Sequence, residues 1–269
     1  MFDIGSWAAG GPGRRPSVYP VLFQYDENVD SRFPLEFACP DLPELSAVCV
    51  GLTIDWRDLD RLHRHAVEAT TPQEHAHAAS FLKRDDALRH LVGRSMLRRV
   101  ASRYAATGPL QPLEVNAWGK PGFSCGDFDC NLSHAGDQVW VALAFGCKIG
   151  IDVESAFFAG DVNEISGGFH PQEIADLRDL PDPTLATLRC WSRKESVAKA
   201  LGMGLSLPLH AYAVDCGDDA AGWLRVAPAG SIPENWTTTD LPVGEGYVGA
   251  LAVHGQCGQV HVLRLEPAS

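Results

Sequence analysis

Two periodicities run along this chain, one typical of helices and the other of strands. Residues 58–70 predict a helix that ends near Pro72. A second helix is predicted from about Glu74 to Tyr104, with a break where a new helix starts near Lys83. In its later part, apolar residues recur three and four positions apart, so one face of this helix is expected to be buried.

Strand patterns fill much of the remaining sequence. Residues 139–145 are apolar on both faces, which predicts a central strand, and residues 149–153 alternate apolar positions with Gly150 and Asp152. The β-branched residues in 48–54 predict another strand. Further segments predicted to be extended are residues 17–23, 113–123, 211–214, 224–226, 246–253 and 260–265. Helices and strands together predict an α/β (α+β) fold.

A short internal similarity indicates two related halves. Residues 250–255 repeat the apolar string of residues 142–146, and in both parts a long helix precedes extended segments that end in such a strand. We therefore expect a first α/β half over residues 46–147 and a second over residues 148–269. Residues 1–45, rich in Gly, Pro and acidic residues, are expected to form an N-terminal extension.

The predicted helix of residues 74–104 also carries basic residues on a second face. His90, Arg94 and Arg98 are spaced four apart and form a cationic stripe, which a solvated surface explains as well as a binding role does. Gly93 in the middle of a helix costs about 1 kcal/mol relative to Ala. This position suggests a close approach by another backbone.

Composition narrows the classes of function. The chain has 269 residues, of which 45% are hydrophobic and 21% charged, as in an ordinary globular protein. Its formal net charge of −12 argues against nucleic-acid binding, which usually needs a basic stripe. The longest apolar run, residues 139–145, is too short to span a bilayer, and the glycine-rich N-terminus does not resemble a signal peptide. We expect a cytoplasmic protein.

The cysteines fit the same expectation. Eight cysteines are scattered along the chain, and only Cys125 and Cys130 are close in sequence. A lone pair with this spacing is weak support for a metal site. We interpret all eight as reduced thiols, several of them in the core.

Asp152 and Glu154 are the first candidate site residues. Both point to the same side of one predicted strand, about 7 Å apart. Two carboxylates this close need a cation or a basic partner, and Mg²⁺ accepts such ligands while leaving positions for phosphate oxygens. The alternative is a strand end whose acids face water, which spacing alone favours.

A second set of candidates lies on a predicted helix that ends at Gly202. Glu195 and Lys199 share one face of it with Ser192. One alternative is a surface ion pair four residues apart, worth about 0.3 kcal/mol. The apolar residues of the same helix favour a packed helix, whose charged stripe would lie at the edge of a cleft.

Two further segments carry residues suited to phosphate. Ser133 and His134 are expected in a turn before a buried strand, where amide and imidazole groups can bind an anion. A hydrogen-bonded turn histidine is the alternative. Lys120, between Gly119 and Pro121, is either a phosphate ligand or a solvated turn lysine.

The order of these motifs is more specific than any one of them. The chain reads Gly-Ile-Asp-Val-Glu at 150–154 and Trp-Ser-x-Lys-Glu-Ser-x-x-Lys at 191–199. Supporting pieces are Phe81, Asp86-Ala87, Gly93, Gly-Lys-Pro at 119–121, Asn-Leu-Ser-His at 131–134 and Gly-Leu-Ser-Leu-Pro-Leu at 204–209. This ordered set, over about residues 80–215, resembles the 4′-phosphopantetheinyl transferases, specifically the monomeric type typified by the surfactin-synthetase activator.

The resemblance implies two pseudo-symmetric α/β halves with coenzyme A in the cleft between them. It also implies site residues: Asp152, Glu154 and Glu195 as ligands of Mg²⁺ or, in its place, Mn²⁺, with Glu195 or a metal-bound water accepting the serine proton. Lys199 would contact the pyrophosphate and assist the leaving group. Contacts to coenzyme A phosphates are implied for Ser133, His134 and Lys120, with Arg89 and Arg94 as further members of the pocket.

The implied reaction is the transfer of 4′-phosphopantetheine from coenzyme A to a serine of an apo acyl or peptidyl carrier protein, releasing 3′,5′-ADP. The alternative is a non-catalytic coenzyme A or nucleotide-binding module of the same fold, and a third option is a structural protein that does not bind coenzyme A. We expect a monomer that binds neither nucleic acid nor membrane. Residues 74–80 depart from the family pattern, since they lack the lysines expected for the coenzyme A 3′-phosphate. Lys83, Arg84 or Arg89 would have to replace them.

Overall fold

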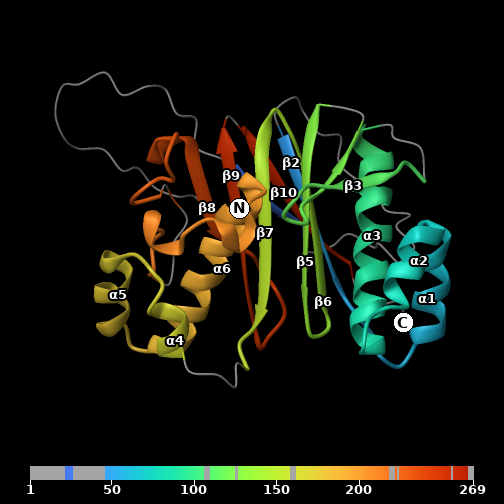
Figure 1. Cartoon of the computed structure of the whole chain (residues 1–269), viewed down its shortest axis with the longest axis horizontal. Coiled ribbons are helices and arrows are strands. Elements are labelled where there is room, and N and C mark those ends of the chain that lie inside the picture. The colour runs from blue at the N-terminus through green and yellow to red at the C-terminus, as the bar shows by residue number, and fades with distance from the viewer. Residues whose placement is uncertain are drawn as a thin grey trace.

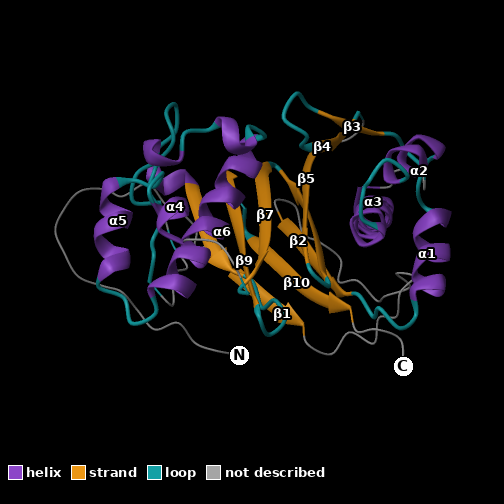
Figure 2. Ribbon diagram, turned by 60° about the horizontal axis from the view of Figure 1, so that its bottom comes forward, coloured by secondary structure: helices purple, strands orange, loops and turns teal. Residues whose placement is uncertain are grey.

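Two β-sheets occupy the middle of this computed structural model, with α1 to α3 on one side and α4 to α6 on the other (Figure 1). Figure 2 shows the same arrangement from a second direction. The structure describes residues 22–26, 46–105, 110–124, 127–157, 162–217, 222, 224–255 and 257–265. The prediction of a mixed α/β fold is confirmed.

The first sheet has five strands, in the order β1-β10-β2-β6-β5. β10 pairs in parallel with both β1 and β2, whereas β6 pairs antiparallel with β2 and β5. The strands are β1 (Leu22–Asp26), β2 (Ser46–Thr53), β5 (Phe128–Ala135), β6 (Gln138–Phe145) and β10 (Gln259–Leu265). Three helices pack on one face of this sheet, α1 (Leu59–Glu68), α2 (Pro72–Ala78) and α3 (Arg84–Ala105).

The second sheet has three strands, in the order β7-β9-β8. They are β7 (Cys147–Ser155), β8 (Trp236–Asp240) and β9 (Tyr247–Gly255), all antiparallel. The helices on this side are α4 (Val162–Ser166), α5 (Pro171–Arg178) and α6 (Pro183–Leu201). Short elements complete the chain: the hairpin of β3 (Leu113–Val115) and β4 (Pro121–Phe123), and the 3₁₀ turns η1 (Gly204–Ser206), η2 (Leu209–Ala211) and η3 (Pro233–Asn235).

β6 is buried on both faces, which explains its apolar sequence. Val139, Val141 and Leu143 pack into the cluster formed with α1 and α3. The alternate residues, Trp140, Ala142 and Ala144, pack against β7 and β9 of the second sheet. The prediction of a central strand here is therefore confirmed. No helix in the described part of the chain combines the length and apolar character needed to cross a bilayer.

The predicted break in the second long helix is confirmed, and capping explains where each piece begins. α2 starts at Pro72, two residues before the predicted position, because Thr71 caps it and exchanges hydrogen bonds with Glu74. α3 then starts at Arg84. The strand predicted at 17–23 is found as β1, which begins at Leu22; residues 17–21 lie outside the described residues.

Two interpretations of α3 are corrected. Arg98 is 1% exposed and donates to both carboxylate oxygens of Glu74, at 2.6 and 3.0 Å, so the stripe is not a solvated surface. The atoms nearest to a Cβ built on Gly93 are side-chain carbons of Leu132 and Val139, both at 3.6 Å. The glycine therefore lets α3 pack on sheet side chains, not on another backbone.

Three predictions about extended segments are also corrected. Residues 211–214 and 224–226 are not strands and share only a bridge between Ala213 and Val226. Their apolar residues are buried because they pack around α6. Their apolar pattern therefore reflects packing on a helix and not pairing with another strand. Ser133 and His134 lie within β5, and the turn comes later, at Gly136 (φ +54°). β8 was not predicted, because its run of threonines lacks hydrophobic alternation.

The division into residues 46–147 and 148–269 remains a prediction. Each of the two similar apolar strings lies in the middle strand of three antiparallel strands, β6 between β2 and β5, and β9 between β7 and β8. The last strand, β10, belongs by sequence to the second half but pairs with β2 in the first sheet. One strand of the second predicted half therefore belongs to the sheet of the first.

Candidate active site

Polar side chains of β5 join the two sheets at the edge of β7. Three alternate side chains of β5 accept hydrogen bonds from backbone amides of β7, so side chains take the place of a backbone ladder. The bonds run from Ile149 N to Asp129 (2.8 Å), from Ile151 N to Asn131 (3.1 Å) and from Val153 N to Ser133 (3.2 Å). This seam brings β5 and the acidic face of β7 together.

A glycine brings the helix α6 onto the same face of β7. A Cβ added to Gly150 would lie 2.0 Å from the carbonyl oxygen of Ser196 and 2.3 Å from the amide nitrogen of Ala200. No larger residue fits without moving α6. Asp152 and Glu154, which follow Gly150 on the same side of the strand, therefore face the helix that carries Glu195 and Lys199.

Asp152 is at the centre of this contact. It is 2% exposed, so the interpretation that it faces water is wrong. Its Oδ1 accepts hydrogen bonds from Lys199 Nζ at 2.6 Å and from Ser133 Oγ at 3.2 Å. Lys199 Nζ also lies 3.0 Å from Ser133 Oγ, so three of the predicted site residues touch one another.

Glu154 and Glu195 are the other two carboxylates of the site. Glu154 accepts a hydrogen bond from the indole of Trp191 at 3.2 Å, and burial together with the charge of Asp152 raises its pKa. Burial and then Asp152 raise the pKa of Glu195 to about 7. The alternative of a surface pair between Glu195 and Lys199 is wrong, because Glu195 is buried and Lys199 pairs with Asp152.

The donor set fits a hard divalent cation. Asp152 Oδ2 and Glu195 Oε1 are buried and have no hydrogen-bond partner within the described residues. Buried carboxylate oxygens are normally paired, and oxygen ligands are those that Mg²⁺ prefers. Three carboxylates that converge with two unpaired oxygens are thus suited to a cation such as Mg²⁺.

Basic groups lie beside the carboxylates. Burial lowers the pKa of His134, and the charges of Arg89 and Lys199 lower it further. Arg89 is fixed by bonds to the carbonyl of Gly136, at 2.7 Å, and to the carboxylate of Asp86. Such a cluster favours an anion with several charges.

A cleft of about 580 Å³ opens next to this cluster. Its lining includes four of the predicted residues: Arg94 from α3, Lys120 from the β3–β4 hairpin, and Glu195 and Lys199 from α6. Arg94 Nε is buried without a hydrogen bond to any described residue, and its nearest charge is Glu74 at 4.0 Å. The guanidinium of Arg94 is therefore a candidate for binding an anion.

Lys120 differs from the other predicted phosphate ligands. Its ammonium group donates to Asp129 at 2.5 Å, to the carbonyl of Ala200 at 2.9 Å and to the carbonyl of Ile149 at 3.1 Å. An ammonium has three N–H donors, and all three are used here. Its geometry does not support the expected phosphate contact.

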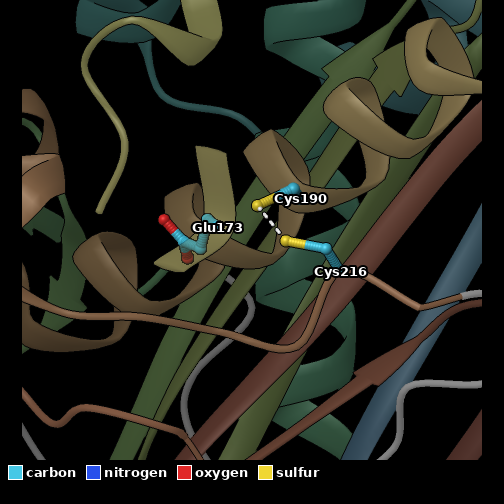
Figure 3. A group of neighbouring side chains, drawn as sticks. All are labelled: Glu173, Cys190 and Cys216. Atoms are coloured by element: carbon cyan, nitrogen blue, oxygen red, sulfur yellow. Dashed lines mark hydrogen bonds between the residues drawn. The ribbon is translucent and has the colours of Figure 1, made fainter. Parts of the chain in front are cut away.

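A second group of potential metal ligands lies on the other side of α6. Glu173, Cys190 and Cys216 are the one such group in the described residues whose ligand atoms all lie within 4.8 Å of one another (Figure 3). The ligand atoms of Asp152, Glu154 and Glu195 do not all lie within this distance of one another. Yet Glu173 already binds the buried ammonium of Lys194, at 2.7 and 2.8 Å, and burial raises the pKa of the Cys190 thiol. This group is a structural ion pair beside two thiols.

Comparisons with known proteins identify the family of this chain. A family model described as "4'-phosphopantetheinyl transferase, N-terminal" matches residues 54–145, and one described as "4'-phosphopantetheinyl transferase superfamily" matches residues 148–252. A 4'-phosphopantetheinyl transferase of Bacillus subtilis is 33% identical over 156 residues, which are 56% of this chain and 68% of that protein. The chain belongs to the 4′-phosphopantetheinyl transferase family. The resemblance drawn from the motifs is confirmed.

Two further family members are similar over a comparable part of the chain. The 4'-phosphopantetheinyl transferase Sfp of Bacillus subtilis (strain 168) is 34% identical over 150 residues, covering 54% of this chain and 65% of that protein. The human L-aminoadipate-semialdehyde dehydrogenase-phosphopantetheinyl transferase is 29% identical over 167 residues, covering 56% of this chain and 54% of that protein. The chain thus spans between about half and two thirds of these relatives.

Sequence reasoning missed several residues that build the candidate site. It did not assign the bond from Trp191 to Glu154, nor the roles of Asp129 and Asn131 in the seam. A signal for the seam was present, since residues 129, 131 and 133 are polar at every second position of a strand that otherwise pairs with the apolar β6.

Proposed function

We propose that this protein transfers the 4′-phosphopantetheine group of coenzyme A to a serine of an apo carrier protein and releases 3′,5′-ADP. The observation that supports this most directly is the meeting of β5, β7 and α6. There, three carboxylates, two of them with a buried unpaired oxygen, lie beside Lys199 and His134. A diphosphate with a bound divalent cation matches this combination of charges, and family membership supplies the reaction.

Asp152, Glu154 and Glu195 are the residues that would hold Mg²⁺ or, in its place, Mn²⁺. When bound, the cation would neutralise charge on the phosphate oxygens as the transition state forms. Asp152 and Glu195 each offer a buried oxygen that no described residue occupies. Trp191 orients Glu154 through its indole N–H.

Basic residues act on the diphosphate itself. Lys199 would stabilise the charge that grows on the oxygen of the departing 3′,5′-ADP, because its ammonium is held at the site by Asp152 and Ser133. Ser133 and His134 would bind the phosphates directly. Arg94, which lines the cleft, and Arg89 would add positive charge.

Glu195 is the proposed general base for the serine hydroxyl. Without a cation, burial and the charge of Asp152 raise the pKa of Glu195 to about 7, so its carboxylate is a stronger base than that of an exposed glutamate. The attacking serine oxygen bonds to the β-phosphorus, and the bond from phosphorus to the bridging oxygen breaks. The proton passes to Glu195 or to a water beside it.

The partner is proposed to be an acyl or peptidyl carrier protein. Carrier proteins are usually acidic, as this chain is, so docking would rely on a local basic or apolar patch. A cytoplasmic location and a monomeric state are further parts of the proposal, drawn from composition and from the internal similarity of the two halves.

The test is to incubate the protein with coenzyme A, Mg²⁺ and a panel of apo carrier proteins and to measure carrier mass. We expect at least one carrier to gain one phosphopantetheine group. A carrier with its acceptor serine replaced by alanine should gain nothing, nor should a reaction with a chelator. Binding of coenzyme A by calorimetry without any mass gain would favour a non-catalytic binding module. No binding at all would favour a structural protein.

A further inference from the structure

The C-terminal end of α6 is completed by side chains from a different part of the chain. We propose that the β3–β4 hairpin caps α6, with Lys120 and Asn116 as positioning residues for Lys199 and Glu195. This inference rests on the proposed function for what the two positioned residues do. It replaces the phosphate contact expected for Lys120.

The last carbonyl groups of a helix have no partner within the helix and need one elsewhere. At the end of α6, the amides of Gly202 and Met203 turn back onto Lys199 and Ala198. The carbonyl of Ala200 accepts from Lys120 Nζ at 2.9 Å, and the carbonyl of Gly202 accepts from Asn116 Nδ2 at 2.7 Å. The hairpin thus supplies both caps, and a cation at this end also complements the helix dipole.

Lys120 connects three elements at the floor of the cleft. Its side chain is only 10% exposed, and its ammonium joins Asp129 of β5, the carbonyl of Ile149 of β7 and the carbonyl of Ala200 of α6. Asp129 also accepts the amide of Ile149, so the carboxylate belongs to both the seam and the cap. A phosphate could bind this ammonium only by displacing one of these partners.

Asn116 gives the hairpin a fixed shape. Its Oδ1 accepts from the amides of Trp118 and Lys120, both at 2.9 Å, and Gly119 in the same turn has φ +87°. Gly202 fits against it closely, since a Cβ there would lie 2.8 Å from Asn116 Nδ2. Asn116 is more exposed than Lys120, so its bond competes with water and is expected to contribute less.

The cap is adjacent to the reacting groups. Lys199 directly precedes Ala200, and its Nζ must stay within 2.6 Å of Asp152 and 3.0 Å of Ser133, which come from two different strands. A misplacement of about 1 Å at such a site costs on the order of 100-fold in rate. Lys120 therefore acts on the reaction through the position of α6.

The experiment compares K120M and N116A with wild type, and uses K148M as a control. Lys148 lies on β7, and its exposed side chain tests the loss of one positive charge alone. We expect K120M to lower kcat on the order of 100-fold and N116A about tenfold. The Kd for coenzyme A, measured by calorimetry with Mg²⁺, should weaken as well, because Lys199 and Glu195 bind the diphosphate and the cation in the proposed function. Hydrogen exchange should rise at the amides of residues 198–203 in both variants, and K148M should match wild type.

Two results would overturn the inference. A weaker Kd for coenzyme A with unchanged hydrogen exchange at residues 198–203 would mean that the ammonium binds the cofactor directly. A lower melting temperature with unchanged kcat and unchanged exchange at residues 198–203 would mean a purely structural contact. If K120M does not fold, N116A decides, because it leaves Lys120 intact. An inactive wild type would refute the proposed function, whereas the exchange data would still report on the cap.

Discussion

Asp152 has two carboxylate oxygens with opposite surroundings. Oδ1 is saturated by Lys199 and Ser133, while Oδ2 is buried with no hydrogen-bond partner among the described residues. An unpaired buried polar atom costs about 1–3 kcal/mol. Glu195 carries a second such oxygen. The two unpaired oxygens therefore lower the free energy of unfolding, and a bound cation that pairs with them would raise it again.

The two unpaired carboxylate oxygens lead to a prediction for single substitutions. Glu195→Gln and Asp152→Ala should each lower the transfer rate by at least about 100-fold, through loss of a metal ligand and, at Glu195, of the base. Both variants should remain folded by circular dichroism. Glu164→Gln, which changes an exposed acid on α4, is the matched control and should be fully active. Wild-type rates in either site variant would remove the metal assignment.

The raised pKa of Glu195 gives a pH dependence with a defined sign. Its pKa in the fold is about 7, above the ordinary 4.5, so its contribution to stability is complete below about pH 4.5 and is lost as pH rises through 7. A cation needs the deprotonated form and competes with the proton. The affinity for Mg²⁺ should therefore rise from pH 6 to pH 8, which titration calorimetry measures. Glu195→Gln should flatten that rise; an equally steep rise in this variant would assign the titration to another group.

At the residue scale, the sequence identified candidate site residues but did not predict which side chains and carbonyl groups they contact. The order of the motifs and the family resemblance pointed to Asp152, Glu154, Glu195 and Lys199. Lys199 contacts Asp152, and the charge of Asp152 helps to raise the pKa of both glutamates. The fate of Lys120 could not be foreseen, because its three acceptors lie 9, 29 and 80 positions away in the chain. Arg98 was likewise ambiguous until its distant partner Glu74 was known.

At the scale of elements, the site depends on how closely α6 lies on β7. Gly150→Ala should destabilise the protein by about 1–3 kcal/mol or more, because the added methyl group would overlap the backbone of Ser196 and Ala200. Chemical denaturation measures this, and transfer activity should fall with it. Gly122→Ala is the control, since a Cβ there meets nothing within 4 Å. Equal stability of the two variants would show that α6 has room to move.

Elements with local signals were predictable, and those without were not. The end of α6 at Gly202 and the start of α2 near Pro72 follow from residues that favour caps. The apolar runs near Tyr212 and Leu224 resemble strands in sequence. They are apolar because they pack on α6, not because they pair with other strands. β8, in contrast, pairs with β9, but its run of threonines lacks the apolar alternation that predicts a strand.

At the scale of the whole molecule, the site forms where two sheets meet. β7 would be the open edge of the second sheet, but side chains of β5 bind its amides and close it. β10 links the halves again by pairing with β2 across more than 200 positions of sequence. Neither contact has a local signal, so the sequence predicted two similar halves without predicting how they are joined.

The central claim is that Asp152, Glu154 and Glu195 hold one divalent cation beside the diphosphate of coenzyme A. The most direct measurement is an anomalous difference map from crystals of the protein grown with Mn²⁺ and coenzyme A. We predict a single strong peak among these three carboxylates, in contact with phosphate oxygens and near Lys199. A peak at Glu173, Cys190 and Cys216 instead, or diphosphate bound with no metal between it and Asp152, would contradict the account.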